Sequence, residues 1–155
     1  MIALKSLIFL TLVPGVIAGL IPFGLLQTGP RIQTGLFSYL AFPLWFVGLA
    51  TLLWSFLEFL QKGKGTPAPI DPPKELVVSG LYRHVRNPMY VGVFLMLVGH
   101  FLWLGYWYLL VYAGLFCIPV FLFVTFYEEP NLKRRFGAAY EDYMKKVPRW
   151  IPKIG

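Results

Sequence analysis

The spacing of charged residues constrains this chain more than any other feature of its sequence. Residues 6–30, 32–57 and 87–127 contain no Asp, Glu, Lys or Arg. A helix that crosses a membrane needs about 20 predominantly apolar residues, because the hydrocarbon core is about 30 Å thick. The first two uncharged runs are each long enough for one span, and the third is long enough for two. The sequence therefore predicts an all-α, polytopic membrane protein with about four transmembrane helices.

The composition supports this fold class and argues against a soluble domain. Of the 155 residues, 57% are hydrophobic and 14% are charged, whereas an average soluble domain has about 25% charged residues. The net charge of +7 is compatible with nucleic-acid binding, but the basic residues flank the apolar runs. That placement follows the positive-inside rule of membrane proteins. We therefore predict contact with membrane lipid and no nucleic-acid partner.

The uncharged runs divide the chain into the parts of a single membrane domain, residues 1–155. The predicted spans cover about residues 2–26, 35–60, 88–104 and 107–127, with a loop at 61–87 and a tail at 128–155. The aromatic residues around Gly105 are typical of a turn at the membrane interface. The tail predicts one short amphipathic helix, from about Asn131 to Lys146, on the membrane surface.

Two features inside the spans predict contacts between helices. Gly15 and Gly19 have the small-xxx-small spacing that lets membrane helices approach closely, and we expect them to pack against another helix of the same chain. His100 lies well inside the third span, where we expect it to make an interhelical hydrogen bond.

The distribution of basic residues predicts the orientation in the membrane. Every Lys and Arg except Arg31 falls in the N-terminus, the 61–87 loop or the tail. Segments on the cytoplasmic side carry the excess of Lys and Arg. We therefore expect a multi-pass protein with both termini and the 61–87 loop in the cytoplasm.

Two polar clusters border the predicted hairpin of the third and fourth spans. Residues 79–90 precede the hairpin, and Glu128 and Glu129 follow it. The two ends of a hairpin are neighbours, so the glutamates should lie near Arg86 and His84. Such pairing lowers the cost of placing charge at a membrane boundary. The pattern alone fits either interfacial salt bridges or a functional site.

The same segments carry a family resemblance. The stretch GLYRHVRNPMYVG, and after it EEPNLKRRFGAAYEDYMKKVPRWIP, resemble the isoprenylcysteine carboxyl methyltransferase family, which is related to membrane phospholipid N-methyltransferases. The resemblance covers about residues 66–152. It implies S-adenosylmethionine as the cofactor, bound on the cytosolic side without a Rossmann domain. The chain accordingly has no G-x-G-x-x-G motif.

The resemblance also implies which residues form the site. Arg86 and Glu129 are the candidate catalytic residues, and no residue is assigned to a metal. The residues expected to bind the cofactor are Lys74, Glu75, Leu76 and Val77 through their backbone, Tyr82, Arg86, Asn87, Pro88, Met89 and Tyr90 as pocket lining, and Glu128 and Glu129 through their carboxylates.

These residue types suit the cofactor's chemistry. Carboxylates bind an ammonium group or ribose hydroxyls, arginine binds a carboxylate, and tyrosine rings attract a sulfonium. The chain departs from the family pattern at Asn87, where a histidine is common. It departs again at residues 107–127, which lack the basic residue that the eukaryotic enzymes carry before the glutamates. Prenylcysteine is therefore one candidate acceptor among several.

The leading hypothesis is S-adenosylmethionine-dependent methyl transfer to a lipophilic acceptor at the cytoplasmic membrane face. The acceptor group would be the carboxylate of a prenylated molecule or of another isoprenoid or lipid. Three alternatives remain: a phospholipid amine N-methyltransferase, an intramembrane reductase that uses a nicotinamide cofactor, and a membrane scaffold without enzymatic activity.

Overall fold

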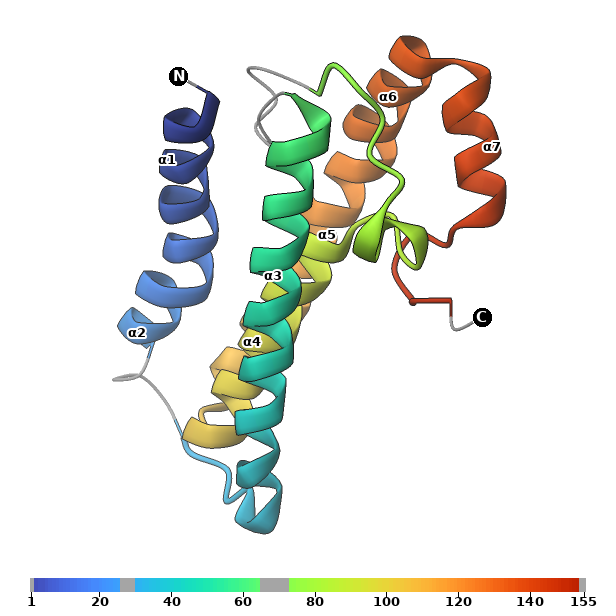
Figure 1. The fold of residues 1–155 in the computed structure, drawn as a ribbon. Helices are drawn as coiled ribbons and strands as arrows, with labels where there is room; N and C mark the ends of the chain where they lie inside the picture. Colours follow the sequence, from blue (N-terminus) through green and yellow to red (C-terminus); the bar gives the residue numbers. More distant parts are fainter. Residues whose placement is uncertain (1, 26–29, 65–72, 154–155) are drawn as a thin grey trace.

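The computed structural model describes residues 2–25, 30–64 and 73–153, and it is helical over most of their length (Figure 1). Apart from an isolated bridge between Arg31 and Tyr106, these residues contain no β-structure. The elements are α1 (Ile2–Gly15), η1 (Val16–Leu20), α2 (Ile21–Leu25), η2 (Gly35–Leu40), α3 (Ala41–Gly63), η3 (Gly80–Arg83), α4 (Pro88–Leu104), α5 (Trp107–Phe123), η4 (Val124–Glu128), α6 (Glu129–Phe136) and α7 (Ala138–Lys146). The predicted all-α class is confirmed.

The long helices have the length and apolar character of membrane spans. Three continuous helical stretches are long enough to cross a bilayer, namely Ser6–Gly24, Gly35–Gly63 and Trp107–Phe136. The fourth, Pro88–Leu104, is apolar but has 17 residues, which corresponds to about 25 Å of helix. The protein is therefore a polytopic membrane protein with three long apolar helices and a shorter one.

A tight turn joins α4 to α5 at the predicted position. Gly105 has a φ of 72°, and an added Cβ would lie 2.4 Å from the Ile32 carbonyl oxygen, so only glycine fits there. The same glycine accepts a hydrogen bond from Ile32 N at 2.7 Å. Arg31 Nε donates to the Leu104 carbonyl at 3.1 Å. The segment before η2 is thus fastened to the end of α4.

Close packing of α3 against α4 depends on Gly48 and Gly92. A Cβ at Gly92 would lie 2.6 Å from the Gly48 carbonyl oxygen, and one at Gly48 would lie 2.7 Å from the Gly92 carbonyl oxygen. Small residues allow backbones to approach this closely in membrane helices. Trp45 Nε1 also donates to His100 Nδ1 at 3.3 Å, which confirms the interhelical hydrogen bond expected for His100.

We predict that Gly92→Ala destabilises the fold, because its methyl group collides with the backbone of α3. Overpacking of this kind costs roughly 1–3 kcal/mol. Gly114→Ala on α5 is the matched control, since a Cβ there meets no described atom within 4 Å. Thermal unfolding in detergent should show a lower midpoint for Gly92→Ala and little change for Gly114→Ala. Equal midpoints for the two variants would contradict the packing.

The expected role of Gly15 and Gly19 is wrong. No described atom lies within 4 Å of the position of a Cβ at either glycine, so neither glycine is a site of close helix–helix packing. This part of the chain instead leaves regular α-helical geometry: Pro14 lies inside α1, and the π-helical turn η1 follows at once. Pro14 has no amide hydrogen to donate, which favours such a local rearrangement.

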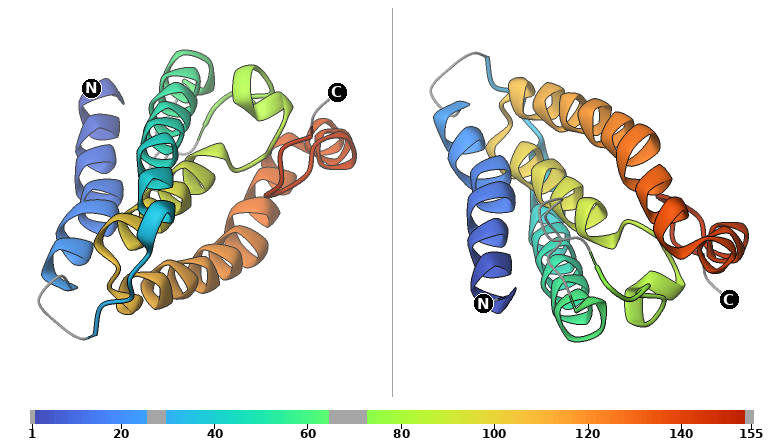
Figure 2. Two further views of the ribbon diagram at one scale, coloured as in Figure 1. Left: turned by 90° about the horizontal axis from the view of Figure 1, so that it is seen from below. Right: turned by 90° about the horizontal axis from the view of Figure 1, so that it is seen from above.

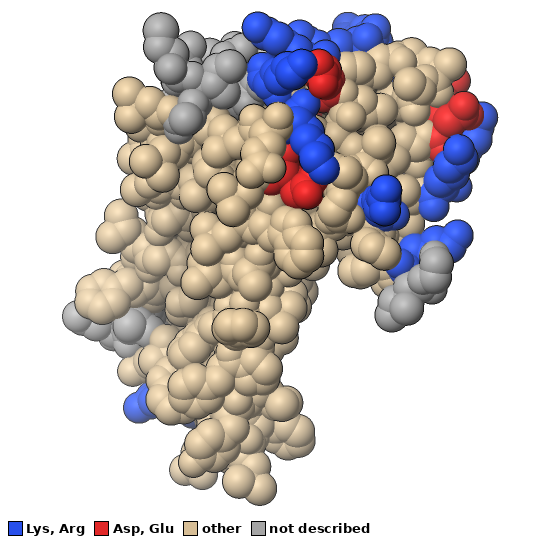
Figure 3. Space-filling view, viewed as in Figure 1, with Lys and Arg blue, Asp and Glu red and all other residues tan. Residues whose placement is uncertain are grey.

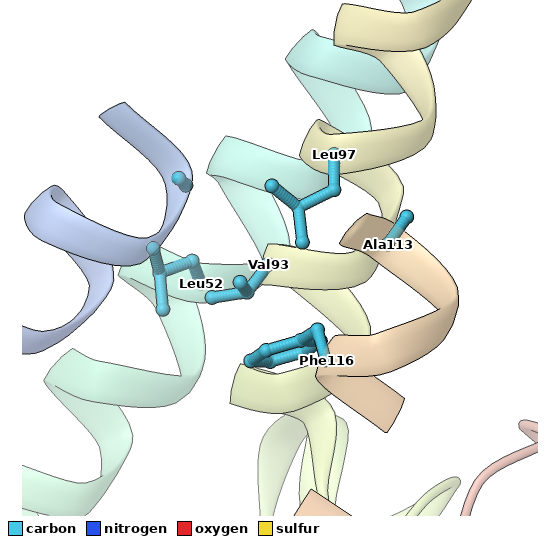
Figure 4. Packing of buried hydrophobic residues seen from close by; sticks show 6 residues of the cluster. Leu52, Val93, Leu97, Ala113 and Phe116 are labelled. Atoms are coloured by element: carbon cyan, nitrogen blue, oxygen red, sulfur yellow. The ribbon is translucent and has the colours of Figure 1, made fainter. Parts of the chain in front are cut away.

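The apolar core lies between α3, α4 and α5. Leu52, Val93, Leu97, Ala113 and Phe116 are buried together, and Figure 4 shows their side chains meeting between the three helices. Ala18 of η1 completes the cluster. This core packs α3, α4 and α5 together next to the helix ends that carry Arg86 and Glu129.

The tail differs from the single helix predicted between residues 131 and 146. Helix α6 continues α5 through the π-helical turn η4, and the chain reverses at Gly137, whose φ of 53° and ψ of −130° suit glycine. Helix α7 then packs Tyr140 and Tyr143 against Leu132 and Phe136. Figure 2 shows α7 lying beside the far end of the long α5–α6 helix.

Candidate active site

A cavity of about 720 Å³ lies between α1, α3, α4 and the α5–α6 helix. This volume is within the range of small-molecule sites, about 300–1,000 Å³. Ten of the twelve residues that the family resemblance assigns to cofactor binding line it: Leu76, Val77, Tyr82, Arg86, Asn87, Pro88, Met89, Tyr90, Glu128 and Glu129. The hairpin of α4 and α5 brings the two polar clusters together at this cavity.

The side chains of Lys74 and Glu75 lie outside the cavity. Both are exposed, and Glu75 forms an ion pair with Lys64 at 2.5 Å. The backbone amide of Lys74 donates to the Gly63 carbonyl at 2.8 Å. These two residues therefore hold the loop against the end of α3, and Leu76 and Val77 follow them into the cavity wall.

Glu129 is the centre of a buried ionic cluster. Its Oε1 lies 3.1 Å from Arg86 Nη1, and the side chains are 8% and 9% exposed, respectively. Arg149 from the tail donates to the same carboxylate through two atoms, Nε to Oε1 at 2.9 Å and Nη2 to Oε2 at 2.6 Å. This fork geometry is the strong, orientation-specific form of an arginine–carboxylate pair. Glu129 is thus held by two arginines.

Two hydrogen-bond donor atoms of Arg86 are available to a ligand in the cavity. Its Nε and Nη1 atoms are buried and have no hydrogen-bond partner among the described residues. Nη1 is near Glu129 Oε1 but does not meet it in hydrogen-bonding geometry. A buried donor without an acceptor costs about 1–3 kcal/mol, so a ligand oxygen placed here would be stabilised. A ligand carboxylate has the required chemistry.

Glu128 differs from its neighbour in having no cationic partner in the described part of the chain. Its Oε2 accepts a hydrogen bond from Tyr90 Oη at 3.3 Å, and it lines the cavity. A carboxylate without a cation in a largely buried site favours a positively charged ligand group. An ammonium group or hydroxyl groups of a ligand would suit this position.

Three tyrosines add uncharged polar surface to the wall. Burial, reinforced by the nearby Glu128 carboxylate, raises the pKa of Tyr82 well above its usual value. Burial also raises the pKa values of Tyr140 and Tyr143. Tyr143 Oη donates to the Tyr82 carbonyl at 2.7 Å. These phenols remain protonated at neutral pH, so they supply rings and hydrogen bonds and do not act as bases.

The remaining wall of the cavity is apolar and comes from membrane helices. Helix α1 contributes Phe9, Leu10, Val13 and Pro14, η1 contributes Ile17, and α5 contributes Phe116, Pro119, Val120 and Phe123. Several of these side chains, among them Val13 and Phe123, are also exposed on the outer surface of their helices. The cavity therefore has a polar end, at Arg86 and Glu128, and an apolar end within the membrane helices.

Sequence reasoning missed several residues at the site. Arg149, Tyr140 and Tyr143 belong to the tail, which we expected to lie as one helix on the membrane surface. Arg134 and Arg135 also line the cavity. The stretch from Glu128 to Pro152 belonged to the family resemblance, and this was the available signal that the tail contributes to the site. No sequence signal pointed to the lining residues of α1.

The fold and the cavity are those of a polytopic helical membrane protein that has an ionic cavity at the ends of its long helices. The chain belongs to the phospholipid methyltransferase family, whose model matches residues 36–139. The match includes α3, α4, α5 and the Arg86–Glu129 pair. It confirms the family resemblance of the two polar motifs.

Two curated relatives resemble parts of the chain. The protein-S-isoprenylcysteine O-methyltransferase of Schizosaccharomyces pombe is 40% identical over 82 residues, which cover 51% of this chain and 34% of the relative. The methanethiol S-methyltransferase of Crocosphaera subtropica is 33% identical over 90 residues, which cover 54% of this chain and 31% of the relative. The matched region thus spans about a third of the length of each relative. The similarity to each relative is therefore limited to this matched region.

Proposed function

We propose that the protein transfers a methyl group from S-adenosylmethionine to a lipophilic acceptor. The observation that carries this proposal is the composition of the cavity. Its polar end combines two donor atoms of Arg86 with the carboxylate of Glu128, and among the described residues the donors have no acceptor and the carboxylate has no cationic partner. Its other end is apolar and is formed by membrane helices. The family, and the names of both relatives, favour methyl transfer at such a site.

In this proposal, each charged residue binds the cofactor group of opposite charge. Arg86 binds the carboxylate of the cofactor, and Glu128 binds its ammonium group or ribose hydroxyls. The rings of Tyr82 and Tyr90 attract the sulfonium by cation–π interaction. When bound, S-adenosylmethionine supplies an electrophilic methyl group. The apolar wall of α1 and α5 orients the acceptor toward that methyl, and alignment of this kind supplies most of the acceleration in a displacement.

The leading acceptor group is a carboxylate on a lipophilic molecule. A carboxylate oxygen attacks the methyl carbon while the carbon–sulfur bond breaks with its electron pair going to sulfur. The products are a methyl ester and S-adenosylhomocysteine. A carboxylate is already ionised near pH 7, so the reaction needs no enzymatic base. This agrees with a cavity whose buried tyrosines keep their protons.

A phospholipid amine is the second candidate acceptor, and the family description favours it. An ammonium group must lose its proton before it can attack a methyl group. Glu128 is the carboxylate in the cavity that has no cationic partner among the described residues, so it would accept that proton. The two acceptor classes differ in the product, which is a methyl ester in one case and an N-methylated headgroup in the other.

Methyl incorporation from labelled cofactor tests the proposal. Membranes that contain the protein should transfer label to the lipid extract, and base treatment should release it as methanol if the product is an ester. Base-stable label in the phospholipid fraction would identify the amine acceptor. Label that appears only in water-soluble metabolites would contradict a lipophilic acceptor.

We also propose that the cavity faces the cytoplasm. Lys and Arg residues gather at the upper end of the molecule in Figure 3, over the ends of α3, α6 and α7. In a variant without Cys117, single cysteines at the exposed positions Lys74 and Lys146 should react with impermeant reagents only after the cytoplasmic side is opened. A cysteine at the exposed position Gln33 should react from outside. Labelling of Lys74→Cys from outside would contradict the orientation.

A further inference from the structure

The segment that follows α7 forms a strap along the loop that precedes α4. The Pro148 carbonyl accepts a hydrogen bond from Arg86 N at 2.9 Å, and Lys153 N donates to the His84 carbonyl at 2.9 Å. The ring Nδ1 of His84 lies 3.0 Å from the Lys153 carbonyl oxygen. Figure 1 shows this segment returning from α7 toward η3. Residues 147–153 are therefore fastened to the segment that carries Arg86.

Arg149 of the strap reaches Glu129 from outside the cavity. Its guanidinium makes the two-atom contact with the Glu129 carboxylate, and its Nη1 donates to Thr125 Oγ1 at 3.1 Å. The guanidinium carbon also lies 5.7 Å from the centre of the Phe121 ring. Arg149, Thr125 and Phe121 do not line the cavity, whereas Glu129 and Arg86 do. Arg149 therefore acts on the cavity through Glu129.

Asn87 binds the strap at Arg149. Its side-chain amide Nδ2 donates to the Arg149 carbonyl oxygen at 3.2 Å, and the side chain is buried at the cavity wall. Asn87 is the position at which the chain departs from the histidine that is common in the family. Its contact here is to the backbone of the strap, and it places Arg149 in reach of Glu129.

We propose that Arg149 is a positioning residue: the strap 147–153 fixes the Glu129 carboxylate, and through it the Arg86 guanidinium, in the geometry that binds the cofactor. The proposal rests on the proposed cofactor site and deepens it. Two arginines share one carboxylate, so Arg149 neutralises Glu129 and leaves the donors of Arg86 available to the cavity. Without Arg149, Arg86 would turn toward Glu129 and satisfy its donors there. Arg149 lies beyond residues 36–139, the part of the chain that the family model matches.

A double-mutant cycle with Arg149→Ala and Glu129→Gln tests this role. The purified full-length protein is titrated with S-adenosylhomocysteine in detergent, and thermal unfolding is measured in parallel. We expect Arg149→Ala to weaken binding about tenfold, which is the scale of losing a charge-assisted contact. In the Glu129→Gln background, the same change should weaken binding by less than about twofold. Arg149→Lys keeps the charge but loses the fork, so its affinity should lie between those of Arg149→Ala and the unmodified protein.

Arg83→Ala is the matched control, because Arg83 is exposed in η3 and does not line the cavity. It should change neither affinity nor unfolding. A loss of affinity that is equally large in both Glu129 backgrounds would assign Arg149 a general role in folding and overturn the proposal. Unchanged affinity in Arg149→Ala would also overturn it. If the unmodified protein binds no S-adenosylhomocysteine, the proposed function is contradicted. The unfolding midpoints then still report whether Arg149 and Glu129 are energetically coupled. If they are not coupled, the role proposed for the strap is contradicted as well.

Discussion

Arg86→Ala should weaken the binding of S-adenosylhomocysteine about ten- to a hundredfold without unfolding the protein. The change removes two donor atoms that have no hydrogen-bond partner among the described residues, and losing one charge-assisted contact to the cofactor costs roughly 1.5–3 kcal/mol. Glu129 keeps its two-atom contact with Arg149 in this variant, so the carboxylate is not left buried and unpaired. The fold should therefore tolerate the substitution. Calorimetric titration measures the affinity, and circular dichroism measures the helical content.

Glu129→Gln should weaken binding by a similar factor, for a different reason. The amide cannot neutralise Arg86 and Arg149, and the two guanidinium groups then repel each other next to the cavity. Arg83→Ala provides the comparison for both variants. If Arg86→Ala and Glu129→Gln bind S-adenosylhomocysteine normally, the ionic cluster is only an anchor between the hairpin and the tail, and the cofactor does not bind there.

Val120→Trp should reduce methyl transfer to a lipophilic acceptor about a hundredfold. Val120 lines the apolar end of the cavity from α5, and an indole ring there would occupy the space needed to align the acceptor. A misplacement of about 1 Å is enough for an effect of this size. Binding of S-adenosylhomocysteine should persist, because the contacts of Arg86 and Glu128 lie at the polar end. Methyl incorporation into the lipid extract measures the first effect and calorimetry the second.

Another residue of the same helix offers a matched control. Ile118 is 56% exposed and does not line the cavity, so Ile118→Trp should leave transfer unchanged. Equal activity of Val120→Trp and the unmodified protein would show that the acceptor does not use the apolar end. Equal loss in both tryptophan variants would indicate a general effect on α5.

The sequence predicted the helices and the main contact of the site, because both follow from local patterns. Uncharged runs of sufficient length must form helices in a membrane, where backbone groups have no water to bind. The hairpin of α4 and α5 has a short turn at Gly105, so the residues at its two open ends had to meet. The prediction that Arg86 and Glu129 are neighbours therefore needed no knowledge of tertiary packing.

The contributions of the tail and of α1 were not predictable in the same way. A single backbone angle at Gly137 reverses the chain and turns one expected surface helix into α6 and α7. Arg149 reaches Glu129 only because the strap then pairs with residues 84–87. The spacing of Gly15 and Gly19 indicated close packing, but these glycines face open space. Contacts of this kind depend on how distant segments meet, which periodicity and spacing do not encode.

Ligand binding to the purified protein in detergent distinguishes a methyltransferase from the alternative functions. Titrations with S-adenosylhomocysteine and with reduced and oxidised nicotinamide nucleotides compare the methyltransferase with the reductase and the scaffold. We expect saturable binding of S-adenosylhomocysteine that is about ten- to a hundredfold weaker in Arg86→Ala and unchanged in Arg83→Ala, and no binding of the nicotinamide nucleotides. Binding of a nicotinamide nucleotide in place of S-adenosylhomocysteine, or binding of neither ligand, would contradict the proposed function.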